Sequence, residues 1–290
     1  MDSLDFPQWI DQSADSGNRA FRQAIHILIQ AISKSEILQA KMIIRGGILL
    51  SVRFKSQRHT TDIDFATSDK YSDLDETEFI NGLKQSLASA CEDLPYGLDC
   101  RIQGAKIQPS GENRNFQTLK IRMGYAYKGS SEHKQLVVNN CPHVIKIDYC
   151  FNEPNHKIDT LQIEDGGEIK AYSIVDLLAE KYRAILQQEI RNRTRRQDSY
   201  DIYYLLENEN LDDDDIKEQI LIALIKKVES RNIEINKGSL LNENIRKRSQ
   251  AEYSRLAQEI TGELPPFDKV YERVNEYYES LPWSKFEDQH

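Results

Sequence analysis

The stretch that decides the fold covers residues 45–65 and reads RGGILLSVRFKSQRHTTDIDF. Residues 48–54 suit one or two helical turns, and the alternation over residues 62–67 predicts a strand. Asp62 and Asp64 lie two apart on that strand, so their side chains point to the same face. Two neighbouring carboxylates are unfavourable unless a cation neutralises them, and Mg²⁺ prefers carboxylate and phosphate oxygens. The stretch therefore predicts a metal-binding pair.

Two further features extend this prediction. Gly46 and Gly47 allow backbone amides to approach a phosphate, and the N-terminus of a following helix adds partial positive charge. A phosphate-binding turn beside a carboxylate pair is the equipment of phosphoryl or nucleotidyl transfer. Asp148 supplies a third carboxylate within an apolar strand, residues 144–151, where an uncompensated charge is costly. Two interpretations stay open: Asp148 binds the metal, or it faces solvent or pairs with a lysine such as Lys146.

The second half of the chain contains polar residues at apolar positions. Lys181 falls on the apolar stripe of a helix predicted over residues 174–188, and it either extends to solvent or reaches an anionic ligand. Asp198 and Asp201 lie on or beside the apolar face of a helix predicted over residues 199–206. The structural interpretation of this pair is a helix cap at Asp198 with Asp201 in the first turn.

The periodicity divides the chain into an α+β part and an all-helical part. In the first part, helices are predicted over residues 18–41 and 76–94, and strands over residues 62–67, 100–107, 116–127 and 144–151. In the second part, helices are predicted over residues 174–188, 199–206, 213–229, 244–260 and 267–281. We therefore expect two domains, residues 1–170 and 171–290.

Composition and targeting signals indicate a soluble cytoplasmic protein. No apolar run approaches the roughly 18 residues that a membrane span needs. The first residues, MDSLDFP, contain neither a basic segment nor a following apolar segment, so they do not predict a signal peptide. The four cysteines form no C-x-x-C pair, which favours reduced, structural thiols over a disulfide or metal role. They are Cys91, Cys100, Cys141 and Cys150.

The net charge of the 290 residues is −9, which at first argues against a nucleic-acid partner. Residues 197–290 contain 12 Lys and Arg against 21 Asp and Glu, so they account for the whole imbalance and residues 1–196 are neutral. Residues 181–196 contain six basic residues and one acidic residue. Because attraction to phosphates acts locally, an RNA substrate is not excluded. The candidate nucleic-acid contacts are Arg53, Arg58, Arg191, Arg193, Arg195 and Arg196.

The order and spacing of these motifs over residues 40–210 resemble the AbiEii/AbiGii toxin family. The resemblance rests on the Gly-Gly pair, Arg53 and Arg58, the TTDIDF motif at residues 60–65, the K-I-D strand, the A-E-K helix and the arginine-rich segment that runs into D-x-x-D. Members of this family belong to the nucleotidyltransferase superfamily with a DNA polymerase β-like catalytic fold. The resemblance thus implies a mixed sheet with flanking helices, followed by a helical part that contributes a lysine and an aspartate to the active site.

The resemblance also implies roles for individual residues. Gly46 and Gly47 would shape the triphosphate site, with Ser51 and Asp201 as further nucleotide contacts. The metal ligands would be Asp62, Asp64 and Asp148. Lys181 would contact nucleotide phosphates, and Asp198 would be the essential acid of the last motif.

The implied activity is Mg²⁺-dependent transfer of a nucleoside monophosphate from an NTP to an acceptor hydroxyl, with release of pyrophosphate. Characterised relatives modify the 3′ end of tRNA and act as toxins of toxin–antitoxin or abortive-infection (phage defence) systems, each with a cognate antitoxin. Two departures bear on nucleotide affinity: Ile48 stands where the family has Ser or Thr, and Gln197 where it tends to have Lys or Arg. Three alternatives stay open: a protein or small-molecule acceptor, a D-x-D glycosyltransferase, and a degenerate nucleotide-binding module.

Overall fold

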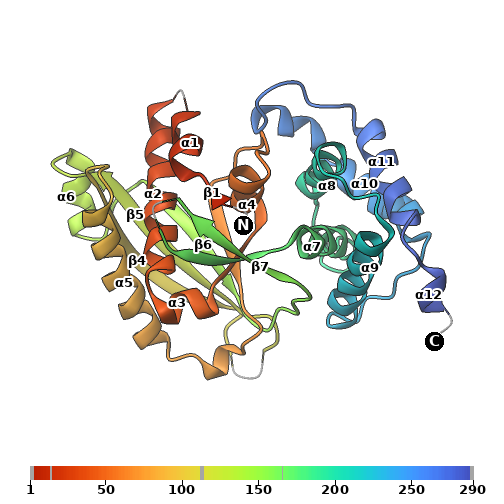
Figure 1. The fold of residues 1–290 in the computed structure, drawn as a ribbon, viewed down its shortest axis with the longest axis horizontal. Coiled ribbons are helices and arrows are strands. Elements are labelled where there is room, and N and C mark those ends of the chain that lie inside the picture. Colours follow the sequence, from red (N-terminus) through yellow and green to blue (C-terminus); the bar gives the residue numbers. More distant parts are fainter. Residues whose placement is uncertain (1–2, 14, 112–113, 165, 288–290) are drawn as a thin grey trace. The chain divides into compact units, whose positions relative to one another are not determined.

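The computed structural model describes residues 3–13, 15–111, 114–164 and 166–287. The chain forms two compact units. Unit 1 contains the residues up to 55 together with residues 60–153 and 159–171. Unit 2 contains residues 56–59, 154–158 and the chain from residue 172 onward. Figure 1 labels the elements of both units.

Unit 1 is built on a mixed sheet, which confirms the α+β prediction. Its strands, in sheet order, are β1 (Ser3–Leu4), β7 (Ile158–Ile163), β8 (Glu168–Tyr172), β2 (Ile43–Arg45), β3 (Asp62–Ala66), β6 (Val144–Cys150), β5 (Thr118–Tyr127) and β4 (Leu98–Gln108). β3 pairs antiparallel with β2 and parallel with β6, and β5 pairs antiparallel with both β6 and β4. β2, β7 and β8 are too short or too irregular in pattern to be predicted from the sequence.

The sheet has an inner face that belongs to the core and an outer face that carries polar residues. Alternate residues of β3, β5 and β6 are buried on the inner face: Ile63, Phe65, Leu119, Ile121, Met123, Ile145, Ile147 and Tyr149. The helices α2 (Ser16–Ser33) and α5 (Glu76–Asp93) pack on this face and on each other (Figure 1). The ring of Phe79 in α5 stacks on Tyr149, with centroids 5.3 Å apart. This alternation is what leaves the other set of side chains on the outer face.

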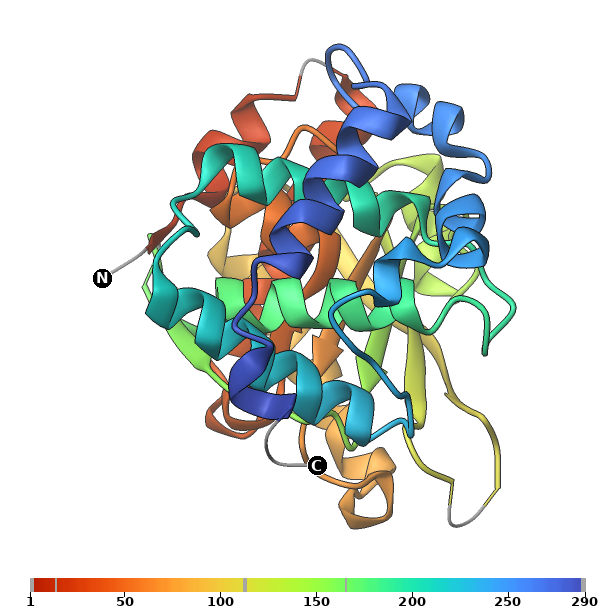
Figure 2. The same cartoon turned by 90° about the vertical axis from the view of Figure 1, so that its right-hand side faces the viewer.

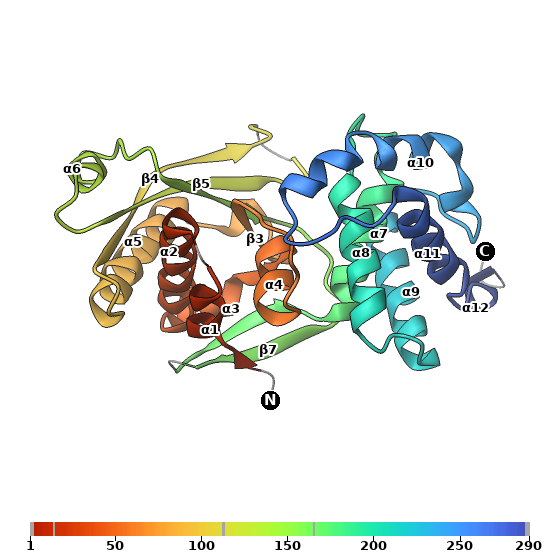
Figure 3. The same cartoon turned by 90° about the horizontal axis from the view of Figure 1, so that it is seen from above.

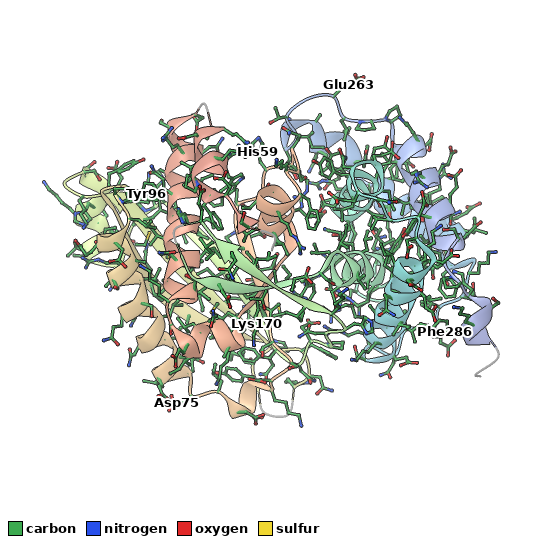
Figure 4. All side chains as sticks on the ribbon, viewed as in Figure 1. His59, Asp75, Tyr96, Lys170, Glu263 and Phe286 are labelled. Carbon is green, nitrogen blue, oxygen red and sulfur yellow. The ribbon has the colours of Figure 1, made fainter. Side chains whose placement is uncertain are left out.

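Short helices complete unit 1. They are α1 (Phe6–Asp11), α3 (Glu36–Lys41), α4 (Gly46–Arg53) and α6 (Ser131–Val137), with a 3₁₀ turn at Tyr71–Asp73. The single helix predicted over residues 18–41 is wrong, because it is divided into α2 and α3. The Ser35 side chain accepts a hydrogen bond from the Leu38 amide and starts a new helix there. Tyr96, labelled in Figure 4, joins the segment after α5 to α2 through a 2.7 Å hydrogen bond between its hydroxyl and His26 Nδ1.

Unit 2 contains the predicted helical part. Its helices are α7 (Ile174–Leu186), α8 (Arg196–Asn208), α9 (Asp214–Glu229), α10 (Glu243–Gln250), α11 (Phe267–Glu279) and α12 (Ser284–Glu287). α7 packs against α8 and α9, and the blue α11 crosses the teal α8 in Figure 2. The helix predicted over residues 244–260 is too long: Glu252 adopts a φ of 60°, which ends the helical path, and a 3₁₀ helix follows at Tyr253–Gln258.

Among the described helices, none combines the length and the apolar character that crossing a lipid bilayer requires.

Candidate active site

Three carboxylates lie at neighbouring positions on the outer face of the sheet. Asp64 of β3 is paired in register with Asp148 of β6, and Asp62 stands two residues before Asp64 on the same face. Asp62 is exposed, whereas Asp64 and Asp148 are half-buried. The Thr60 hydroxyl donates a 2.5 Å hydrogen bond to Asp62 Oδ1. The sheet register therefore brings together the three residues that the sequence predicts as metal ligands.

The surroundings of Asp148 explain how a carboxylate is tolerated there. Burial raises the pKa of Asp148, and the charge of Asp62 raises it further, while Lys120 and Arg45 oppose the shift. Lys120 Nζ lies 4.0 Å from Asp148 Oδ2. The nearest lysine partner thus comes from β5, and Lys146, the partner suggested by the sequence, exerts a smaller influence. Asp148 keeps a pKa above its ordinary value, which suits a group that accepts a proton.

Gly46 is required by the local geometry. It starts α4 directly after β2, with a φ of +75° that side-chain-bearing residues rarely adopt. A Cβ atom at this position would lie 2.4 Å from Asp64 Oδ2, which is far inside van der Waals contact. The glycine therefore permits both the turn into α4 and the position of the Asp64 carboxylate.

The N-terminus of α4 adjoins this carboxylate. Gly47 and Ile48 occupy its first turn, and the N-cap residue Arg45 forms no capping hydrogen bond through its side chain. Amides of a first helical turn that lack a capping side chain suit an anion such as a phosphate. Ile48 is buried in the core, and Ser51 is buried within α4. A nucleotide contact from Ser51 stays a prediction.

The donor chemistry of the carboxylates fits a hard divalent cation. All three residues offer carboxylate oxygens, and the pKa of Asp148 is raised by burial and by the negative charge of Asp62. Within the described ranges, no three His, Cys, Asp or Glu residues are spaced closely enough to form a complete cation site as they stand. The ligand set of Asp62, Asp64 and Asp148 therefore stays a prediction.

Unit 2 contains a second cluster, formed by Lys181, Asp198, Asp201 and Arg58. Lys181 Nζ lies 2.6 Å from Asp201 Oδ2 and 3.2 Å from Asp198 Oδ1. Arg58 donates two hydrogen bonds of 2.8 Å to the two oxygens of Asp201. Lys181 and Asp198 are buried, and Asp201 is completely buried. Lys181 therefore points inward, and the interpretation that it extends to solvent is wrong.

The cluster keeps its members charged. Burial alone would raise the pKa of Asp201, but the charges of Arg58 and Lys181 outweigh it and lower that pKa. Burial alone would lower the pKa of Lys181, but Asp201 and Asp198 outweigh it and raise that pKa. The pKa of Arg58 is raised because Asp201 overcomes the cost of burial. Two cations and two anions thus compensate one another in a buried site.

Asp198 differs from Asp201 in its hydrogen bonding. The N-cap of α8 is Arg195 and the helix begins at Arg196, so the cap interpretation of Asp198 is wrong. The residue instead lies in the first turn and faces Lys181. Its Oδ2 atom is buried and has no hydrogen-bond partner among the described residues; Arg195 Nη1 lies 3.7 Å away. A buried carboxylate oxygen without a partner is uncommon and indicates a place for a ligand or a bound water.

Ion pairs engage most of the arginines predicted to contact nucleic acid. Arg53 Nη1 lies 2.7 Å from Asp159, and Arg196 bonds to Glu252 and Glu259 at 3.0 and 2.9 Å. Arg58 is committed to Asp201, and Arg195 lies near Asp198. Arg191 and Arg193 are exposed.

Two features of the site are missed by sequence reasoning. The pairing of Arg58 with Asp201 joins residues 143 positions apart, and no local pattern signals it. The approach of Lys120 to Asp148 depends on the register of β5 and β6. The alternation of basic and apolar residues in both strands is the one signal that could have found it.

Comparisons with known proteins agree with the geometry. A family model described as "Nucleotidyl transferase AbiEii toxin, Type IV TA system" matches residues 28–273. Among solved structures, JHP933 from Helicobacter pylori has a TM-score of 0.53 at 14% identity, covering 96% of each chain. MenT4, a nucleotidyltransferase toxin from Mycobacterium tuberculosis H37Rv, has a TM-score of 0.47 at 11% identity, covering 95% of this chain and 97% of its own. The comparison with curated proteins yields no match.

Proposed function

The chain belongs to the AbiEii family of nucleotidyltransferase toxins from type IV toxin–antitoxin systems, and we propose that it transfers a nucleoside monophosphate from an NTP to the 3′ hydroxyl of a tRNA with Mg²⁺ as cofactor. The observation that carries this proposal is the row of Asp62, Asp64 and Asp148 on one sheet face, with the glycine-started helix α4 against Asp64. The reaction would occur in the cytoplasm, and the family implies a cognate antitoxin.

The proposed reaction is a single displacement at the α-phosphorus. The acceptor hydroxyl oxygen forms a bond to that phosphorus, the bond to the bridging oxygen of the β-phosphate breaks, and pyrophosphate leaves. Asp148 accepts the hydroxyl proton, and its raised pKa supports this role. Mg²⁺, held by Asp62, Asp64 and Asp148, would offset the negative charge that develops on the phosphate oxygens.

The first turn of α4 provides amides for the triphosphate. Gly46 and Gly47 add no side chain of their own over these amides, the N-cap residue Arg45 does not cap them, and the helix N-terminus favours an anion. We further propose that Lys181 contacts the nucleotide phosphates and that Asp198 holds Lys181 in its orientation. The unpartnered Oδ2 atom of Asp198 supports a role beyond the ion pair. Asp201, bound by Arg58 and Lys181, would fix the cluster.

The test is transfer of label from each of the four NTPs, labelled at the α-phosphorus, to total tRNA in the presence of Mg²⁺. We expect one NTP or a subset to label tRNA at the 3′ end, and we expect no label from an NTP labelled at the γ-phosphorus. The Asp64→Asn variant and chelation of the metal should each abolish transfer.

The acceptor and the activity are tested separately. Addition of a cell extract in place of tRNA reveals a protein or small-molecule acceptor, and label on those fractions alone would overturn the tRNA assignment. If the wild-type chain labels no acceptor and is no more toxic than the variant with Asp62→Ala and Asp64→Ala, the catalytic proposal fails. The chain would then be a nucleotide-binding module.

A further inference from the structure

The outer face of β4, β5 and β6 carries a basic surface beside the carboxylates. The pairing aligns Asp64, Asp148, Lys120 and Lys106 in one row across four adjacent strands. A second row aligns Asp62, Lys146, Arg122 and Gly104. Residues paired across strands share a face, so the four cations and the three carboxylates belong to one surface. We call Lys106, Lys120, Arg122 and Lys146 the basic surface.

The members of the basic surface are exposed, and little negative charge opposes them. Within the part of the chain that the structure describes, the side chains of Lys106, Arg122 and Lys146 take part in no hydrogen bond or ion pair, and Lys120 meets Asp148 only at 4.0 Å. On this face, the remaining acid of β4, β5 and β6 is Asp99, near the opposite end of β4, where it bonds to Arg101 and His133. Apart from the contact of Lys120 with Asp148, the strand sequences therefore leave a positive area without an internal partner among the described residues.

The helices of unit 1 do not cover this area. α2 and α5 lie on the inner face of β4 and β5, as Figure 3 shows from above. On the outer face, α6 packs near Gly124 and Ala126, where Leu136 and Cys141 form a small apolar cluster with Ala126. Arg122, Lys120 and Lys146 lie beyond that cluster, toward the carboxylates. Apolar packing thus ends where the basic surface begins.

We propose that the basic surface binds the phosphate backbone of an RNA acceptor and guides its terminal hydroxyl to Asp148. This inference rests on the proposed nucleotidyl transfer. Adjacent strands are about 4.8 Å apart, so Lys106, two strands from Asp148, stands roughly 10 Å from it. A small acceptor does not extend that far, whereas a polynucleotide places successive phosphates over β5 and β4. Exposed, unpaired cations suit such contacts, since they release no internal ion pair on binding.

The surface also differs from the arginine-rich segment at residues 191–196. There, Arg195 and Arg196 already have acidic neighbours, and only Arg191 and Arg193 are exposed. The basic surface belongs to unit 1 and the arginine-rich segment to unit 2, so RNA binding by each can be tested separately. Substitution of the basic residues in each region in turn identifies the region that binds the phosphate backbone of the RNA.

The test is binding of a 5′-fluorescein-labelled stem-loop RNA with a single-stranded 3′ tail, followed by fluorescence anisotropy at several salt concentrations without NTP. The test variant is Lys106→Gln with Arg122→Gln, which leaves the carboxylates and both lysines beside them unchanged. We expect weaker binding and a salt slope that is lower by about 1.4, since each contact to a single strand contributes about 0.7. The matched control is Lys84→Gln with Lys134→Gln, at exposed lysines of α5 and α6; its slope should stay unchanged.

Three results would overturn the inference. The first is that the test variant binds RNA as tightly as the wild-type chain. The second is that the control variant loses as much RNA affinity as the test variant. The third is that RNA affinity falls only in the variant with Arg191→Gln and Arg193→Gln. Magnesium–NTP binding, measured by calorimetry, should be equal in the wild-type chain and the test variant, because neither substituted residue adjoins α4. If the wild-type chain transfers label to a protein and does not bind the RNA, this inference fails while nucleotidyl transfer stands.

Discussion

At the scale of the residue, Gly46 and Asp64 share a space that has no room for a methyl group. We expect Gly46→Ala to lower transfer by about 100-fold, because displacement of a reactive group by an ångström has an effect of that size. The positive φ adds a cost of roughly 1–2 kcal/mol, so the melting temperature should fall by a few degrees. The control is Gly82→Ala in α5, where a Cβ meets nothing within 4 Å. It should keep full activity and gain up to about 1 kcal/mol. Wild-type transfer by Gly46→Ala would contradict the assigned contact with Asp64.

The raised pKa of Asp148 predicts that its carboxylate lowers the stability of the folded chain while it supports activity. Its pKa is raised in the folded chain by burial and by Asp62, so the folded state binds the proton more tightly than the unfolded state. The contribution of Asp148 to the free energy of unfolding is fully present below its ordinary pKa of 3.8. It is lost as the pH rises through the pKa that Asp148 has in the folded chain. Asp148→Asn should therefore raise the melting temperature at neutral pH while it abolishes transfer. Thermal unfolding followed from about pH 3 to about pH 8 should show the gain disappear in acid. A gain independent of pH would contradict the assignment.

At the scale of the element, Asp201 fixes α8 to its neighbours through three hydrogen bonds, and Asp198 adds one. Asp201→Asn leaves the two buried cations, Arg58 and Lys181, with Asp198 as the remaining anion of the cluster, so we expect a loss of about 3–5 kcal/mol in the free energy of unfolding. Asp198 has one hydrogen-bonded oxygen and one without a partner. Its replacement by Asn should cost only about 1–2 kcal/mol while it reduces transfer strongly. Urea unfolding of both variants checks the order, and equal losses would show that Asp198 is merely structural.

The elements also show which parts of the structure the sequence could predict. Segments with a regular pattern, such as the strand that carries Asp62 and Asp64 and the helix that carries Lys181, are predicted because their pattern is local. The break at Ser35 is missed because a capping serine competes with a continuing apolar stripe. The carboxylates could be proposed as a set from the motifs, but the contacts of Lys120 and Arg58 could not. Sheet register decides the first contact, and tertiary packing across the chain decides the second.

At the scale of the whole molecule, unit 2 depends on short segments from the first part of the chain. Asp176, fully buried in α7, accepts hydrogen bonds from the amides of His156 and Lys157, and Asp201 depends on Arg58. All three donors lie before residue 172. Residues 172–290 produced alone should therefore fail to unfold cooperatively in thermal circular dichroism, whereas the full chain should unfold with a sharp transition. A sharp transition in the isolated segment would show that these buried carboxylates find other partners.

Unit 2 is built from three separate stretches of the chain, and this arrangement affects how its gene segment can be exchanged. A module that occupies one continuous stretch of a gene can pass to another gene in a single recombination event. Here the residues around Arg58 and those around His156 are encoded within the gene segment for unit 1, so a crossover near codon 172 separates Asp201 and Asp176 from their donors. Such an exchange removes Arg58 from Asp201 and the amides of His156 and Lys157 from Asp176, so we expect the recombinant chains to be less stable. Single substitutions on an intact chain should therefore be tolerated more readily than exchange of unit 2 as one segment.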